Sequence, residues 1–397
     1  MLGRGARGLV ATYRDAFGGL PRLTWLLCLA AFFNRCGAMV VPFLNPYTNA
    51  TFGYTPEQAA FVVSLYGVGA VAGSYAGGWL TDRIGPVRAQ ASALLSTALW
   101  MFLMPLIRQP GWFEAAVVTL AFANEAFRPG SIAAVAVSCE PHLRRKAIAL
   151  NRLMLNLGWA FGPPIGGQLI RVDYSLMFYA DGATCGLAAL FLLFGLGGFS
   201  PKPEPKPHGA PTTRVLRDRH FVLLMLANLI VITAFAQYYS NGPRIWQDDG
   251  YDEATFAWFL AVNPILIVLF EMLVVHALSR RRALPIIAIG SLLVGVGYAV
   301  LLAPLGATGI VIAMAIIAWG ELLQMPLLSA HINDRAPPHA RGAYNGAYGM
   351  VFSLAQILAP LFGAWLYGGF GQDTLWLACL GLGALGALLF WRAARTE

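Results

Sequence analysis

The chain alternates long apolar runs with short polar breaks along its whole length. A membrane-spanning helix needs about 20 consecutive, mostly apolar residues, and runs of that length recur throughout. In a bilayer a helix satisfies its backbone hydrogen bonds within itself, so the pattern predicts an all-α membrane protein. The breaks delimit twelve predicted spans, near residues 23–46, 56–81, 87–107, 113–137, 147–170, 176–199, 219–243, 255–278, 284–304, 308–331, 343–367 and 372–391.

Composition excludes a soluble protein. Hydrophobic residues make up 58% of the chain and charged residues only 12%, whereas soluble domains carry about 25% charged residues. A soluble enzyme and a nucleic-acid-binding protein are therefore excluded. The five cysteines stand singly, without the spacing of a disulfide framework or a metal site, so we expect neither a metal nor a cofactor. The expected environment of such a chain is the lipid bilayer.

The net charge is +8, and the distribution of the basic residues along the chain indicates the membrane topology. With both termini placed inside, most of the 27 lysines and arginines fall in the predicted inner loops. Arg108, Arg171 and Arg244 alone fall in outer segments. Inner loops rich in lysine and arginine fix the orientation of a membrane protein, so both termini are predicted to be cytoplasmic.

A proline-rich, basic segment at 200–218 divides the spans into two sets of six. We predict two pseudo-symmetric six-helix bundles, residues 1–199 and 219–397, joined by this cytoplasmic linker. Prolines within apolar spans kink helices and free backbone groups, so their repetition at a constant offset indicates a duplicated unit. Two such repeats are a common transporter architecture, with the substrate site at their interface. At an offset of 197 residues, Pro46 matches Pro243, Pro129 matches Pro326, Pro163 matches Pro360, Gly166 matches Gly363 and Arg83 matches Arg280.

The loop after the second predicted span carries a motif of glycine, acid and arginine. Its residues are Gly78, Asp82, Arg83, Gly85 and Arg88. The motif resembles the loop signature G-x-x-x-D-R-x-G-x-[RK]-[RK] of the major facilitator superfamily, although Val87 stands at one of its two closing basic positions. The resemblance extends to the six-plus-six layout, and it implies a conformational latch in a bacterial cytoplasmic (inner) membrane. The alternative is that these charges serve only the inside-positive rule.

The fifth predicted span carries Gly158, Gly162, Pro163 and Gly166, which fit G-x-x-x-G-P-x-x-G-G. This motif resembles that of the drug/proton antiporter branch of the superfamily, in which it is associated with export. Glycines four residues apart form a flat face on which another helix packs closely. We expect a gating hinge here, and the alternative is an ordinary packing groove.

Several charged and polar side chains lie within apolar spans, where a charge costs at least about 2.5–3.5 kcal/mol unless it faces a partner or a water-filled cavity. The resemblance implies that spans 1, 4, 7 and 10 line such a cavity. The predicted proton-coupling residues are Glu321, Glu125, Arg128 and Glu271. The predicted substrate-binding residues are Asn34, Arg35, Asn124, Gln237, Tyr238, Tyr239 and Gln324.

Two alternatives remain for these residues. Glu125 and Arg128 lie one helical turn apart and can pair, so a static Arg35–Glu125–Arg128 brace would also explain them. Tyr238 and Tyr239 also suit ordinary anchoring at a membrane interface.

The sequence thus predicts a transporter, not an enzyme. Its expected partners are a small-molecule substrate, protons and the lipid bilayer, without nucleic acid, and the chain is expected to act as a monomer. The leading hypothesis is proton-driven export of small amphipathic molecules or drugs by alternating access. One alternative is a proton symporter that imports a peptide, sugar or organic anion. Another is a membrane sensor or scaffold that does not transport.

Overall fold

The computed structural model describes residues 17–37, 39–196, 217–278, 281–337 and 341–396. Within these ranges the chain is helical and contains no strand. Residues 200–216 of the predicted linker, and Arg280, lie outside the described residues.

The elements before the linker are α2 (Arg22–Cys36), α3 (Val40–Phe52), α4 (Pro56–Ile84), α5 (Pro86–Leu103), η1 (Met104–Leu106), α6 (Pro110–Val137), η2 (Pro141–Leu143), α7 (Arg144–Ile170), α8 (Tyr174–Leu190) and η3 (Phe191–Gly195). Those after it are α9 (Arg219–Phe235), α10 (Gln237–Ser240), α11 (Gly242–Asp248), α12 (Glu253–Leu278), α13 (Ala283–Val300), α14 (Gly306–Arg335), α15 (Arg341–Phe370) and α16 (Gln372–Arg395).

Within the described residues, ten helical segments are long and apolar enough to cross a membrane. The predicted count of twelve is therefore not confirmed, and the two segments that fall short are α6 and α7. Both have the length, at 28 and 27 residues, but Glu125 and Arg128 on α6 and Arg152 on α7 reduce their apolar character. Twelve spans remain a prediction.

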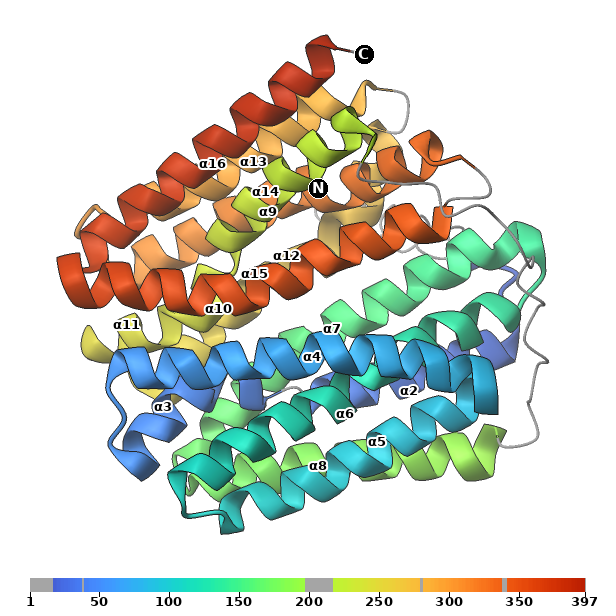
Figure 1. Cartoon of the computed structure of the whole chain (residues 1–397), viewed down its shortest axis with the longest axis horizontal. Helices are drawn as coiled ribbons and strands as arrows, with labels where there is room; N and C mark the ends of the chain where they lie inside the picture. The colour runs from blue at the N-terminus through green and yellow to red at the C-terminus, as the bar shows by residue number, and fades with distance from the viewer. Residues whose placement is uncertain (1–16, 38, 197–216, 279–280, 338–340, 397) are drawn as a thin grey trace, which may run out of the picture.

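The helices of each half pack mainly on one another. Helix α4 packs on α6, α5 on α6 and α8, and α2 on α7, while α13 packs on α14 and α16. Figure 1 shows α2–α8 in its lower part and α9–α16 in its upper part. The halves meet where α7 packs on α12 and α4 on α15; there the Ser64 hydroxyl donates to the Ile357 carbonyl at 3.0 Å. The domain boundaries remain a prediction.

A similar glycine contact recurs in the two halves, with the glycines 197 residues apart and their partners 198 residues apart. Gly166 of α7 lies against Phe43 of α3. Gly363 of α15 lies against Asn241, the residue that follows α10. In both cases the partner segment is broken into shorter helices, α2–α3 in the first half and α9–α11 in the second. The recurrence supports the duplicated unit proposed from the prolines.

Glycines bring the α4 backbone directly onto α6. Without a hydrophobic driving force between helices in lipid, small residues that permit close packing stabilise helix pairs. An added Cβ on any of three α4 glycines would overlap α6 backbone atoms. Gly69 faces Val118, Gly73 faces Phe122 and Gly77 faces Ala126.

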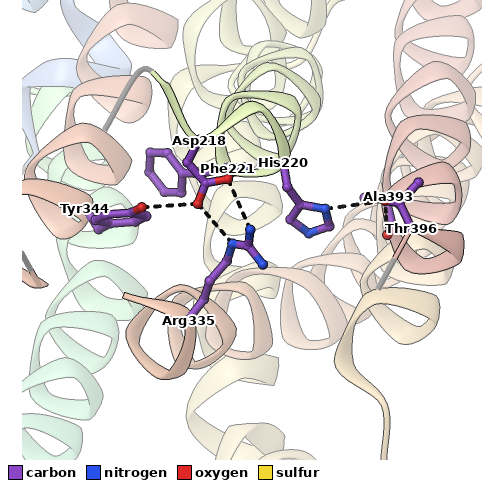
Figure 2. A network of polar contacts seen from close by, with 7 residues as sticks. All are labelled: Asp218, His220, Phe221, Arg335, Tyr344, Ala393 and Thr396. Carbon is purple, nitrogen blue, oxygen red and sulfur yellow. Dashed lines mark hydrogen bonds and ion pairs between the residues drawn. The ribbon is translucent and has the colours of Figure 1, made fainter. Parts of the chain in front are cut away.

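Polar contacts at the predicted inner end join α9, α14 and α15 (Figure 2). Asp218 caps α9 by accepting from the Phe221 backbone N–H at 3.1 Å. Arg335 of α14 donates to both carboxylate oxygens, at 3.2 and 3.1 Å, and the Tyr344 hydroxyl of α15 donates at 3.1 Å. Partial burial alone would raise the pKa of Asp218, but these hydrogen bonds and the Arg335 charge outweigh it and hold the pKa below its ordinary value.

We predict opposite effects of alanine at two adjacent glycines. Gly77→Ala should destabilise the protein by about 1–3 kcal/mol, because its Cβ would overlap the α6 backbone. Gly78 has open space around it, so Gly78→Ala should be neutral or stabilising by about 0.5–1 kcal/mol through helix propensity. Thermal unfolding in detergent measures both. A Gly77→Ala protein as stable as the wild type would contradict the packing.

We also predict a pH-dependent effect of Asp218→Asn, which keeps an acceptor for Phe221 but removes the charge. Because the folded-state pKa of Asp218 is lowered, its stabilising effect is present above the ordinary pKa and is lost as pH falls through the folded value. The variant should melt below the wild type at pH 7, and the difference should shrink below pH 3.8, the ordinary pKa. Asp334→Asn, at an exposed neighbouring position, is the control. A pH-independent difference would exclude the charge as the cause.

Candidate functional site

A cavity of about 240 Å³ lies between the two sets of helices. Its walls include Arg35 of α2, Glu125 and Arg128 of α6, and Glu321 of α14. Tyr238 and Tyr239 of α10 complete the predicted residues that line it. Side chains from both halves thus converge on one space.

The charged residues of the first half do not form the predicted brace. Among the described residues, no ion pair joins Glu125 to Arg35 or Arg128, although all three line the cavity. A spacing of one turn permits pairing but does not enforce it. The Arg35 Nε is buried without a hydrogen-bond partner in the described part of the chain. These charges are therefore available to a ligand or to water in the cavity.

Glu321 is the acid on the opposite wall, with 7% of its surface exposed. The Asn263 side-chain amide of α12 donates to its Oε2 at 3.1 Å. Within the described residues no cation lies at ion-pair distance from Glu321. A neutral donor stabilises the carboxylate less than a cation does.

Aromatic side chains line much of the remaining wall. Tyr66, Trp159, Phe235 and Phe352 join the two predicted tyrosines. Pockets that bind small molecules combine such apolar surface with a few placed polar groups. The cavity suits an amphipathic ligand.

Two glutamines predicted to bind substrate form hydrogen bonds between helices. The Gln237 amide donates to the Ala359 carbonyl of α15 at 2.9 Å, and the Gln324 amide donates to Asn228 of α9 at 2.8 Å. Neither lines the cavity. In this structure both side chains form helix–helix hydrogen bonds, and their role in substrate binding remains a prediction.

The two predicted asparagines are also not among the residues that line the cavity. Asn34 is buried and accepts a hydrogen bond from the Cys185 thiol of α8 at 3.5 Å. Asn124 donates to the Tyr66 hydroxyl of α4 at 2.6 Å. Asn124 therefore positions a lining residue without lining the cavity itself.

Glu271, predicted to couple protons, is not among the lining residues. Its carboxylate pairs with Arg152 of α7, with Nε and Oε1 3.0 Å apart. The ion pair joins the two halves and neutralises the carboxylate charge of Glu271. This geometry favours a bracing role over proton transfer.

The loop signature lies at the end of α4. Asp82 and Arg83 fall in its last turn, and the Arg83 guanidinium stacks over Trp79 at 4.2 Å. Gly85 makes the turn with a φ of 86°, which favours glycine. Gly78 lies inside the helix, not in the turn.

Two other positions of the signature differ in exposure. Arg88 is exposed, whereas Val87 is buried, which accounts for an apolar residue at a basic position of the motif. The gating role of the loop remains a prediction.

The glycine stripe of α7 packs on the first span. Gly158 lies against Arg35, where an added Cβ would come within 2.7 Å of the Arg35 Cβ, and Gly166 lies against α3. Gly162 and Pro163 are buried in the same helix. The stripe therefore brings Arg35 close to α7, while its role as a hinge remains a prediction.

Several relevant residues escaped the sequence analysis. Asn156 and Trp159 of α7 and Asn263 of α12 reach the cavity or its acid. Asp181 of α8 is a buried acid near the cavity charge Arg35. An isolated amide or acid within an apolar span was the signal available for Asn263 and Asp181.

Comparison with known proteins identifies the family. A family model described as Major Facilitator Superfamily matches residues 27–320 and 245–397. The chain belongs to this superfamily. Its members are transporters and not enzymes, and the resemblance noted in the sequence is confirmed.

Three bacterial relatives align over most of the chain. An uncharacterised MFS-type transporter, YttB, of Bacillus subtilis (strain 168) is 27% identical, covering 91% of this chain and 92% of the relative. A Na(+), Li(+), K(+)/H(+) antiporter of Planococcus maritimus is 24% identical, with 83% and 86% covered. The multidrug resistance protein MdtH of Edwardsiella ictaluri (strain 93-146) is 25% identical, with 80% of each covered.

A crystal structure of a peptide transporter, POT, in a mutant form bound to sulfate has the same fold. The two structures superpose with a TM-score of 0.82 at 17% identity, covering 96% of each chain. At this identity the likeness shows the fold alone. The chain is therefore a multi-pass membrane transporter with the major facilitator fold.

We predict that the Arg152–Glu271 pair stabilises the contact between α7 and α12. Arg152→Gln and Glu271→Gln should each lower the free energy of unfolding, and with it the melting temperature. Each loss should be smaller than the about 3–5 kcal/mol of a fully buried pair, because the Arg152 side chain is 36% exposed. The double variant should cost less than the sum of the single ones. Strictly additive losses in a double-mutant cycle would mean that the two side chains do not interact.

Proposed function

We propose that the chain is a proton-coupled secondary transporter that exports small amphipathic molecules by alternating access of its two halves. The observation that carries this proposal is the cavity shared by the two halves, with Arg35, Glu125, Arg128 and Glu321 on an aromatic wall. Buried charges that meet no counter-charge are costly in a membrane and mark ion or substrate pathways.

Glu321 is the proposed proton carrier. It shares the cavity with the ligand, and among the described residues the Asn263 amide is its one hydrogen-bond donor. A cationic or polar ligand at this carboxylate would displace its proton, and reprotonation would release the ligand. Substrate and proton would thus exclude each other, which is the requirement for antiport.

The relatives and the α7 stripe favour export over import. MdtH is named a multidrug resistance protein and the Planococcus maritimus relative a cation/proton antiporter. The stripe from Gly158 to Gly166 resembles the antiporter motif and packs on the first span beside Arg35. The bacterial relatives also favour a place in the cytoplasmic membrane, and the lysines and arginines of the predicted inner loops favour both termini inside.

Alternating access requires contacts at the predicted outer end to open. There Arg171 pairs with Asp252, with Nε and Oδ2 3.1 Å apart, and the Tyr174 hydroxyl donates to Glu253 at 2.7 Å. Figure 1 shows α4 and α15 close together near α3 and α11 and farther apart toward the C-terminal end of α4. We propose that this arrangement is the state closed to the outside.

We predict that Glu321→Gln abolishes transport driven by a pH gradient but keeps substrate exchange, because the amide preserves shape and removes the titratable proton. The measurement is efflux of a fluorescent organic cation from liposomes, with and without a pH gradient. Glu271→Gln is the matched control, since this acid lies outside the cavity, and it should keep gradient-driven transport.

Other outcomes discriminate between the hypotheses. Wild-type coupling in Glu321→Gln would place the proton site elsewhere, with Glu125 the next acid of the cavity. Proton-driven uptake of a peptide or sugar, without efflux of any cation, would replace export with symport. Binding without flux would indicate a sensor.

A further inference from the structure

A surface groove of about 620 Å³ runs between the end of α5 and the start of α6. Trp100 and Leu106 form one wall, and Trp112, Ala115 and other α6 residues form the other. Trp112 and Leu106 are 70% and 67% exposed. Figure 1 places α5 along the lower edge of the assembly, away from α9–α16. In a membrane protein such an exposed apolar face lies against lipid.

One end of this groove is polar. Arg108 and Gln109, from the connection between η1 and α6, line it there. Gln109 occupies the N-cap position of α6 but makes no side-chain cap, so the first-turn N–H groups of Gly111 and Trp112 lack a side-chain acceptor. Open space surrounds Gly111. A helix N-terminus beside an arginine attracts an anion.

Arg108 differs from the other two arginines of the predicted outer side. Arg171 pairs with Asp252, and Arg244 pairs with Asp248 at 3.1 Å. In the described part of the chain no acid lies at ion-pair distance from Arg108. Arg108 therefore has no ion-pair partner among the described residues, and it lies at the end of an apolar groove.

Asp173 acts on Arg108 only at longer range. Its carboxylate caps α8 by accepting from the Ser175 backbone N–H at 2.6 Å. This acid is already engaged and leaves the guanidinium of Arg108 available.

We propose that this groove binds one phospholipid, with the head-group phosphate at Arg108 and the first turn of α6, and an acyl chain along Trp100 and Trp112. Arginine binds phosphate through paired N–H donors, and tryptophan favours the membrane interface. An anionic head group such as phosphatidylglycerol is preferred, because the one formal charge at the polar end is positive. This site is separate from the central cavity and does not depend on the proposed direction or coupling of transport.

The test is native mass spectrometry of the detergent-purified full chain, titrated with phosphatidylglycerol. One lipid should remain bound to the wild type. Arg108→Gln should weaken the affinity by about tenfold or more, the size expected for a lost charge-assisted hydrogen bond. Trp112→Ala should also weaken it, and since Trp112 is largely exposed the variant should fold. Arg244→Gln, which removes a paired arginine, should retain the lipid.

Two further probes separate head group from chain. Diacylglycerol, which has the chains without the phosphate, should bind the wild type at least about tenfold more weakly, and inorganic phosphate alone should not stabilise the protein against heat. Equal retention of phosphatidylglycerol by Arg108→Gln and the wild type, both folded by thermal unfolding, would overturn the proposal. So would equal binding of diacylglycerol, which would leave only an apolar surface, or stabilisation by phosphate alone, which would leave only an anion site.

Discussion

The cost of a charge in hydrocarbon governs the arrangement of this molecule. At about 2.5–3.5 kcal/mol or more for each charged group at the bilayer centre, Arg35, Glu125, Arg128 and Glu321 have to face inward. Helices from both halves therefore surround a polar space, and the cavity is where these side chains meet. Two of these charges, Glu125 and Arg128, also reduce the apolar character of α6, which falls short of the composition of a membrane span. The cavity and the weak span signal of α6 therefore have one cause.

Close backbone packing then decides which charges reach that space. Gly158 of α7 leaves no room between that helix and Arg35, so the arginine side chain has to extend along the interface toward the cavity. On α4, glycines at every fourth position bring α6 into backbone contact, and α6 carries Glu125 and Arg128. Small residues therefore do more than join helices, because their positions set the rotation and depth of the helices that hold the charged side chains.

Sequence predicted what depends on composition and missed what depends on helix rotation. Arg35 and Glu321 were predicted to reach the cavity because a charge in mid-span requires a polar environment, and both line it. Asn34 was predicted on the same grounds, yet one position along a helix turns a side chain by about 100°, and Asn34 faces Cys185 instead. Gln324, one turn from Glu321, faces Asn228.

The same limit applies to pairing. Spacing along one helix suggested that Glu125 and Arg128 pair, whereas the partner of Glu271, on a distant segment, had no signal in the sequence. The glycine motifs predicted close helix packing, but they did not predict which glycine contacts the neighbouring helix. Gly78 belongs to the signature, and an added Cβ there would meet no atom within 4 Å, whereas its neighbour Gly77 lies against the α6 backbone. Such distinctions require the partner helix.

The contacts that hold the halves together differ in a way that suits alternation. The ion pairs beside α7 and α12 are partly exposed, with Arg152 to Glu271 near one end and Arg171 to Asp252 at the other. Of the charges between them, Glu321 is buried, Arg35 and Glu125 are partly buried, and Arg128 is exposed. An exposed ion pair contributes about 0–1 kcal/mol, which applies to Arg171 and Asp252, whereas Glu271 is buried and its pair is costlier to break. Opening both ends at once would expose the cavity charges and the aromatic wall together. Ion pairs that can break at one end at a time are therefore compatible with a transporter that opens to one side at a time.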